Sequence, residues 1–127
     1  MILAGTASAA EGPPDPLIRE NCRKAEAIVK GVIVSSETKA NDFTRTKFRV
    51  SGVFRGPFHP GDELTYFSFR ESAERSAREL EQNLIVFLVG WTAAGPRQWG
   101  TAIDFSEFSA SPQLESKVRN CVGRKRR

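Results

Sequence analysis

The chain has 127 residues, of which 39% are hydrophobic, enough for one packed domain and too few for a second. Its formal net charge is +4, but the last four residues (Arg124, Lys125, Arg126 and Arg127) are all basic, so the rest of the chain carries no net charge. No apolar run approaches the roughly 18 residues that a membrane-spanning helix needs, so we expect a soluble chain with no transmembrane segment.

The first sixteen residues carry features of an export signal followed by a linker. Residues 1–10 are small and apolar, and Ala7-Ser8-Ala9 fits the small-x-small pattern that signal peptidases cleave. The basic start and longer apolar stretch of a complete signal are missing, so we interpret residues 1–16 as a signal-peptide remnant and a proline-rich linker. A disordered Ala-rich terminus is the alternative. We therefore expect a secreted or periplasmic protein.

The pattern from Asp15 onward predicts a short helix and then a strand. Asp15 is the expected N-cap, with Pro16 at the first helical position. The apolar face contains three residues at i, i+4 and i+7: Ile18, Cys22 and Ala25. Residues 27–35 are rich in β-branched side chains, and Gly31 among them suits a bend or bulge in a barrel strand.

Two further strands are separated by a turn. Residues 43–55 alternate between apolar and basic side chains, which predicts a half-buried strand. Its inward residues would be Phe48, Val50 and Phe54, and its outward residues Arg45, Lys47, Arg49 and Arg55. Residues 55–62 are dense in glycine and proline and predict a turn, and residues 63–69 predict the third strand.

The second half of the chain predicts a helix, two strands and a last helix. Residues 71–82 carry a narrow apolar stripe and i, i+4 charge pairs, which indicates a surface helix. Residues 84–89 are continuously apolar, as in a central strand, and residues 99–108 alternate with Trp99, Ile103 and Phe105 inward. Ser111-Pro112 predicts a helix start, and the apolar face that follows contains Leu114, Val118 and Cys121.

This order of elements predicts a mainly β fold. A five-stranded Greek-key barrel of the oligonucleotide/oligosaccharide-binding (OB) type has a helix between its third and fourth strands, as expected here at residues 71–82. The predicted helices before the first strand and after the fifth would flank the barrel.

Several segments resemble the netrin-like module found in tissue inhibitors of metalloproteinases and in many secreted bacterial proteins. They are Cys22 to Val32, Phe48 to Gly56, Gly61-Asp62-Glu63-Leu64, Leu84-Ile85-Val86-Phe87-Leu88 and Cys121. The resemblance covers about residues 17–122, leaving residues 123–127 as a basic tail. It implies a disulfide between Cys22 and Cys121, because the family bridges its first helix to its last. An even cysteine count in an exported domain points the same way, and two buried thiols are the alternative.

The sequence lacks the features of an inhibitor of that family and of an enzyme. The inhibitors chelate zinc through a Cys-x-Cys at the start of the mature chain, and here no cysteine precedes Cys22. The only histidine, His59, lies in a Pro-Gly turn and is expected to be solvated. Asp104 and Glu107 are three apart on a predicted strand, hence on opposite faces, and cannot form an acid/base pair. We expect no catalytic residue, metal site or cofactor.

A binding module with an unknown protein or cell-envelope partner is the remaining interpretation, and we expect it to be monomeric. We predict that the loop at residues 36–42 and the turn at residues 57–62 form one barrel mouth that binds the partner. The candidate binding residues are Ser36, Glu37, Lys39, Asn41, Asp42, Phe58, His59 and Asp62.

Binding of single-stranded nucleic acid or another polyanion is the main alternative, because OB barrels use aromatic platforms and cations on the second and third strands. The candidate contacts are Arg45, Lys47, Arg49, Arg124, Lys125, Arg126 and Arg127, near the aromatic residues Phe43, Tyr66 and Phe67. A solvated strand face would look the same in the sequence. Metalloproteinase inhibition by a different mechanism is a further alternative.

Overall fold

A computed structural model describes residues 13–38, 44–68, 82–91, 98–103 and 106–123. Within these ranges the elements follow in the order α2 (Asp15–Lys24), β1 (Ala27–Thr38), β2 (Thr44–Arg55), β3 (Glu63–Ser68), β4 (Leu84–Trp91), β5 (Gln98–Thr101), β6 (Glu107–Ser109) and α4 (Pro112–Gly123). The predicted helix at residues 71–82 lies almost entirely outside the described residues.

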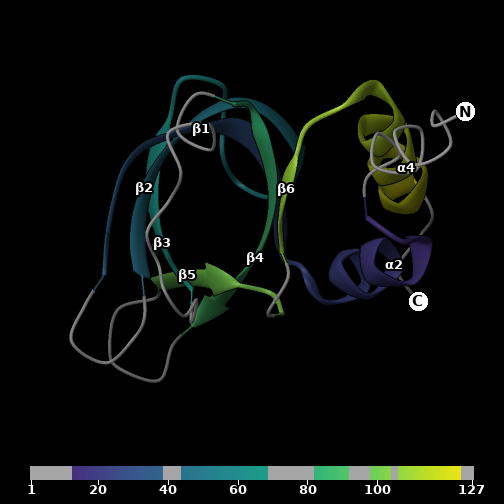
Figure 1. The fold of residues 1–127 in the computed structure, drawn as a ribbon, viewed down its shortest axis with the longest axis horizontal. Helices are drawn as coiled ribbons and strands as arrows, with labels where there is room; N and C mark the ends of the chain where they lie inside the picture. The colour runs from purple at the N-terminus through teal and green to yellow at the C-terminus, as the bar shows by residue number, and fades with distance from the viewer. Residues whose placement is uncertain (1–12, 39–43, 69–81, 92–97, 104–105, 124–127) are drawn as a thin grey trace, which may run out of the picture.

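The first five strands close into a mixed barrel, with α2 and α4 side by side on one flank (Figure 1). The strand order is β1-β2-β3-β5-β4, and β1 also pairs with β4, which closes the ring. β3 and β5 are parallel, whereas the other pairs are antiparallel, including the short β6 against β4. The predicted mainly β barrel with flanking helices is therefore confirmed, and its topology is compatible with an OB fold.

Gly31 lies where β1 pairs with two neighbouring strands at once. It pairs with Val50 of β2 and with Leu84 of β4, next to a register irregularity between Lys30 and Gly31. A Cβ atom here would lie 1.9 Å from the carbonyl oxygen of Arg49, a distance that no side chain could tolerate. The expected bend or bulge at this glycine is confirmed, and close approach of the β2 backbone is its physical cause.

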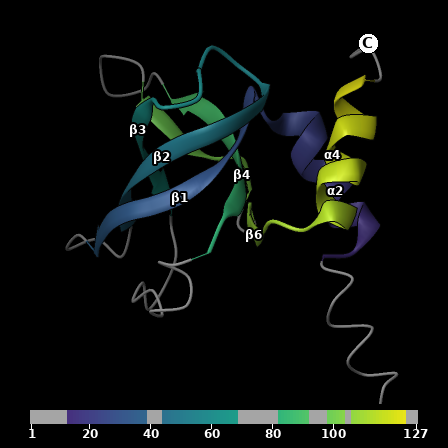
Figure 2. The same cartoon turned by 90° about the horizontal axis from the view of Figure 1, so that it is seen from above.

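Two apolar cores hold the molecule together, one inside the barrel and one between the barrel and the helices. The first, which we call the barrel core, contains Ala27, Val29, Ile33, Phe48, Val50, Leu64, Tyr66, Leu84, Val86 and Leu88. The second, the cap core, contains Ile18, Cys22, Ala25, Ile28, Ile85, Phe87, Leu114 and Val118. β4 alternates between the two, which explains its uninterrupted apolar sequence. Figure 2 shows the helices stacked on the β4 and β6 side.

The apolar face predicted for α2 is confirmed, because Ile18, Cys22 and Ala25 are all buried in the cap core. The predicted N-cap is wrong: Pro14 is the capping residue, and no side chain caps the helix. Asp15 lies instead in the first turn, where the helix dipole favours an acid, and its carboxylate is 2.8 Å from Nζ of Lys117 in α4.

α4 begins and is anchored as the sequence predicted. The Leu114 N–H donates to Oγ of Ser111 at 3.1 Å, which confirms the capping hydroxyl. Leu114 and Val118 are buried, and Cys121 forms a disulfide with Cys22 across 99 residues of sequence. The bridge ties the first helix to the last and is consistent with an oxidising periplasmic or extracellular location. Neither helix of the described segments has the length and apolar character needed to cross a bilayer.

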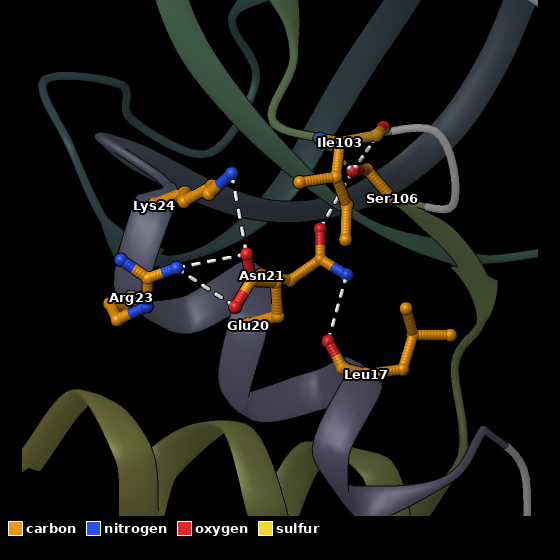
Figure 3. Close-up of polar contacts among 7 residues, drawn as sticks. All are labelled: Leu17, Glu20, Asn21, Arg23, Lys24, Ile103 and Ser106. Carbon is orange, nitrogen blue, oxygen red and sulfur yellow. Dashed lines mark hydrogen bonds and ion pairs between the residues drawn. The ribbon is translucent and has the colours of Figure 1, made fainter.

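The prediction of one strand over residues 99–108 is wrong. β5 ends at Thr101, and residues 107–109 form β6, which pairs with β4. The Ser106 hydroxyl accepts a hydrogen bond from the Ile103 N–H and lies 2.7 Å from Oδ1 of Asn21, a fully buried residue in α2 (Figure 3). The link gives the buried side chains of Asn21 and Ser106 hydrogen-bond partners, as the burial of polar groups requires.

The inward face of β2 changes partway along the strand. Phe48 and Val50 are buried in the barrel core, but Phe54 packs against the cap core, so its predicted place beside them is wrong. Irregularities in the pairing of β1 with β2 shift the alternation. At the end of the strand Arg55 donates to the carbonyl oxygens of Cys22 and Ala25, at 2.7 and 2.9 Å. It thus provides a hydrogen-bond donor for carbonyl groups at the C-terminal end of α2, which have no partner within the helix.

An ion pair between β1 and α4 makes stability depend on pH. Nζ of Lys30 donates to Glu115 at 2.8 Å, and this hydrogen bond, with the charges of Lys30 and Arg119, holds the pKa of Glu115 below its ordinary value of 4.5. The unfolded carboxyl therefore binds a proton at higher pH than the folded one. The stabilisation is present above the unfolded pKa and is lost as the pH falls through the lowered folded pKa.

We expect Glu115→Gln to lower the free energy of unfolding by about 1 kcal/mol at neutral pH and to reduce its loss on acidification to about pH 3. Thermal unfolding followed by circular dichroism over this range tests both effects. An unchanged midpoint and an unchanged pH dependence in the variant would contradict the assignment.

Candidate functional site

A polar groove lies on the outer face of β1, β2 and β3. It has a volume of about 410 Å³ and is lined by Ser35, Ser36, Glu37, Arg45, Lys47 and Thr65. The strict alternation at the start of β2 places Thr44, Thr46 and Phe48 inward and the cations between them outward. The groove thus brings together Ser36 and Glu37, predicted as loop residues, with Arg45 and Lys47, predicted as polyanion contacts.

The strand register sets which side chains face one another in this groove. Glu37 lies opposite Arg45, and their charged atoms are 3.9 Å apart with both side chains more than half exposed. Lys47 lies between Ser35 of β1 and Thr65 of β3. Such exposed, long ion pairs contribute little to stability, so the Arg45 guanidinium is available to an incoming anion at small cost.

The cations of β2 differ in how far the protein already neutralises them. Arg49 is 3.1 Å from the Glu63 carboxylate on β3, so its charge is compensated. Lys47, by contrast, has no ion pair with any residue in the described ranges. Arg49, the third of the predicted contacts on β2, does not line the groove. Arg45 and Lys47, with Glu37, leave the groove with an excess of one positive charge.

A β-bulge exposes an apolar side chain on β1, directly before Ser35, the residue that pairs with Lys47. The pairing of β1 with β2 is irregular between Ile33 and Ser35, so Val34 is an extra residue in the strand. Its side chain is 41% exposed, and no other large hydrophobic side chain is exposed in the described part of the chain. Sequence reasoning missed Val34, because it follows Ile33 in an apolar run and nothing local marks the bulge.

The two segments predicted to form one barrel mouth adjoin different parts of β2. At one end of β2 Thr44 pairs with Thr38, and at the other end Arg55 pairs with Ile28 and leads into the turn at residues 56–62. The turn folds back along the strand, and the Val50 N–H donates to the Asp62 carbonyl oxygen at 2.8 Å. The two predicted segments flank opposite ends of β2. Lys39, Asn41, Asp42, Arg124, Lys125, Arg126 and Arg127 lie outside the described residues.

The turn at residues 56–62 closes one end of the barrel. The Phe58 ring packs on Trp99, with ring centres 5.2 Å apart, against the barrel core. The His59 N–H donates to the Asp62 carboxylate at 2.8 Å, and Gly61, with φ of 99°, donates to the Val50 carbonyl. The His59 side chain is 83% exposed, as predicted for a solvated histidine. Two of the three candidate residues here thus have a clear structural role.

The predicted aromatic platform is not available on this face at Tyr66. That side chain is fully buried in the barrel core, edge-on to Phe48, and its hydroxyl donates to the carboxylate of Glu107. Phe67, which lies opposite Arg45, is half-buried. Base stacking needs exposed ring faces, so this part of the surface offers charge and hydroxyl groups more than stacking.

The described residues contain no group of three or more histidine, cysteine, aspartate or glutamate side chains placed to hold a metal ion. A scan against models of known protein families finds no match, and no curated protein matches the chain.

Proposed function

We propose that this protein is an exported, netrin-like interaction module that binds a protein partner through the groove on β1, β2 and β3. The barrel flanked by helices, the disulfide and the sequence resemblance support the type of module. The proposal includes no catalytic activity and no cofactor. A rigid sheet that presents a polar groove is a common way for such a barrel to hold a partner.

The observation that carries the proposal is the chemistry of the groove. Lys47 and the weakly paired Arg45 provide positive charge, Ser35 and Thr65 provide hydroxyl groups, and Val34 offers an apolar contact nearby. This mixture suits an acidic protein segment that also carries an apolar side chain. Charge complementarity of this kind sets specificity and the rate of association.

Two alternatives receive less support. The described face has few exposed aromatic rings, and the chain apart from its last four residues carries no net charge, so little drives the binding of nucleic acid. Cys22 lies inside α2 and is bridged to Cys121, so it cannot form the N-terminal zinc-chelating wedge of the metalloproteinase inhibitors. Metalloproteinase inhibition by a different mechanism has no feature of the described residues in its favour.

The experiment places a photo-crosslinking residue at Ser35 and exposes the purified protein to periplasmic and extracellular extracts of the native host. The matched variants are Arg45→Gln/Lys47→Gln and, on α2, Arg19→Gln/Arg23→Gln, which remove equal charge. We expect an adduct with an acidic protein, and about tenfold weaker binding of that protein by the first variant only.

Equal binding by the two double variants would overturn the proposal. Binding to a single-stranded oligonucleotide that weakens steeply with salt and is lost in Arg45→Gln/Lys47→Gln would instead assign the groove to nucleic acid.

A further inference from the structure

A second groove lies where β1 and β2 meet α4, at the opposite half of the β1–β2 pair from the first groove. It has a volume of about 570 Å³, within the range of about 300 to 1,000 Å³ typical of small-molecule sites. Its lining includes Lys30 of β1, Val53 and Phe54 of β2, and Glu115, Arg119 and Val122 of α4. The disulfide at Cys121 holds the helical wall in place.

The charged part of this groove has a surplus of one positive charge. One oxygen of Glu115 is 2.8 Å from Nζ of Lys30, and the other is 3.6 Å from the Arg119 guanidinium. The single carboxylate thus lies between two cations. Lys30 and Glu115 are less than one-third exposed, so their charges are only partly screened by solvent. A second carboxylate placed beside Lys30 and Arg119 would balance the charges.

The rest of the groove is open and mainly apolar, and Ser51 is the only uncharged polar side chain among its lining residues. Val53 packs against the barrel core, and Phe54 and Val122 pack against the cap core, so each presents only part of its surface to the groove. Gly52 also lines it, and a Cβ atom there would meet only the Cβ of Lys30, at an ordinary 3.8 Å. Packing therefore does not require a glycine at this position. The effect of Gly52 is to leave the groove free of a side chain.

We propose that this groove binds a small amphipathic carboxylate with an alkyl chain. Its carboxylate would contact Lys30 and Arg119, and its chain would cover Phe54 and Val122. The combination of one unbalanced positive charge with an apolar floor selects this class over neutral apolar molecules and over cations. The site is independent of the groove on β1, β2 and β3 and shares no residue with it.

The test is a titration of the folded protein with decanoate, followed by the backbone amide signals in nuclear magnetic resonance spectra. Decanol and decylammonium serve as neutral and cationic probes of the same chain length. We expect saturable shifts at Gly52, Phe54 and Val122 with decanoate below about 10 mM, and much weaker effects with the other two probes. Residues of the first groove should not shift.

Two variants sharpen the test. Gly52→Val adds a β-branched residue that strands accept well and fills the groove, so decanoate binding should be lost while the fold remains. Arg119→Gln removes one cation and should weaken binding about five- to tenfold, or about 1 to 1.4 kcal/mol. If Gly52→Val unfolds, Gly52→Ala replaces it, with a smaller expected loss. Absence of saturable shifts, equal binding of decanol, or undiminished binding in both variants would overturn the proposal.

Discussion

Replacing both bridged cysteines, as Cys22→Ser/Cys121→Ser, is expected to lower the free energy of unfolding by about 3 to 5 kcal/mol. The bridge closes a loop with a sequence separation of 99, and in the chain-entropy model a loop of about that length contributes up to about 4.7 kcal/mol. A domain of this size has a total stability of only about 5 to 15 kcal/mol. Denaturant unfolding of the variant and the wild type, oxidised and reduced, measures the effect.

The surface ion pair Asp15–Lys117 provides a matched control, since it also joins α2 to α4. It is largely exposed, so Asp15→Asn should change stability far less than loss of the disulfide does. If reduction leaves the unfolding midpoint of the wild type unchanged, packing in the cap core alone holds α2 and α4 in place. The Cys22–Cys121 bridge then makes no large contribution to stability.

The second large effect is expected at Gly31. Gly31→Ala would place a methyl group against the carbonyl oxygen of Arg49 and 2.8 Å from the Phe48 ring. Because the obstacle includes backbone, relief requires displacement of β2, and we expect a loss of about 3 kcal/mol. Denaturant unfolding again gives the measurement.

Gly52→Ala is the matched control, because Gly52 lies in the same strand pair but has room for a Cβ atom. It should be neutral or stabilising by up to about 1 kcal/mol, through the reduced entropy of the unfolded chain. If both variants lost the same free energy of unfolding, the loss would not come from the close approach of the Arg49 carbonyl to Gly31, and the explanation given for Gly31 would be contradicted.

Local signals predicted much of this fold. The i, i+4 spacing of Ile18 and Cys22 placed the cysteine in the cap core, and the Ser111-Pro112 start of α4 depends only on adjacent residues. The continuous apolar pattern of β4 identified a strand buried on both faces. Each of these features is encoded within one turn or one strand, where sequence periodicity is informative.

Features that depend on distant partners could not be predicted. Beyond the end of β5, the Ser106 hydroxyl donates to Oδ1 of Asn21, 85 positions away in the chain, and no local pattern marks that contact. The outward turn of Val34 depends on the pairing register with β2, and the second groove needs α4 to lie beside Lys30. Four of the six residues that line the first groove are candidates in the sequence: Ser36, Glu37, Arg45 and Lys47. The outward direction of the two cations follows from strand alternation, but the separation of the groove from the turn at residues 56–62 follows from topology alone.

Export of the barrel with its Cys22–Cys121 disulfide closed is the central proposal for this protein. Its most direct test is the intact mass of the protein isolated from its native host, with and without reduction and thiol alkylation. We expect the protein in the periplasm or the medium, with no uptake of alkylating agent before reduction and two equivalents taken up afterwards, at Cys22 and Cys121. A cytosolic protein whose two thiols are alkylated without reduction would contradict it.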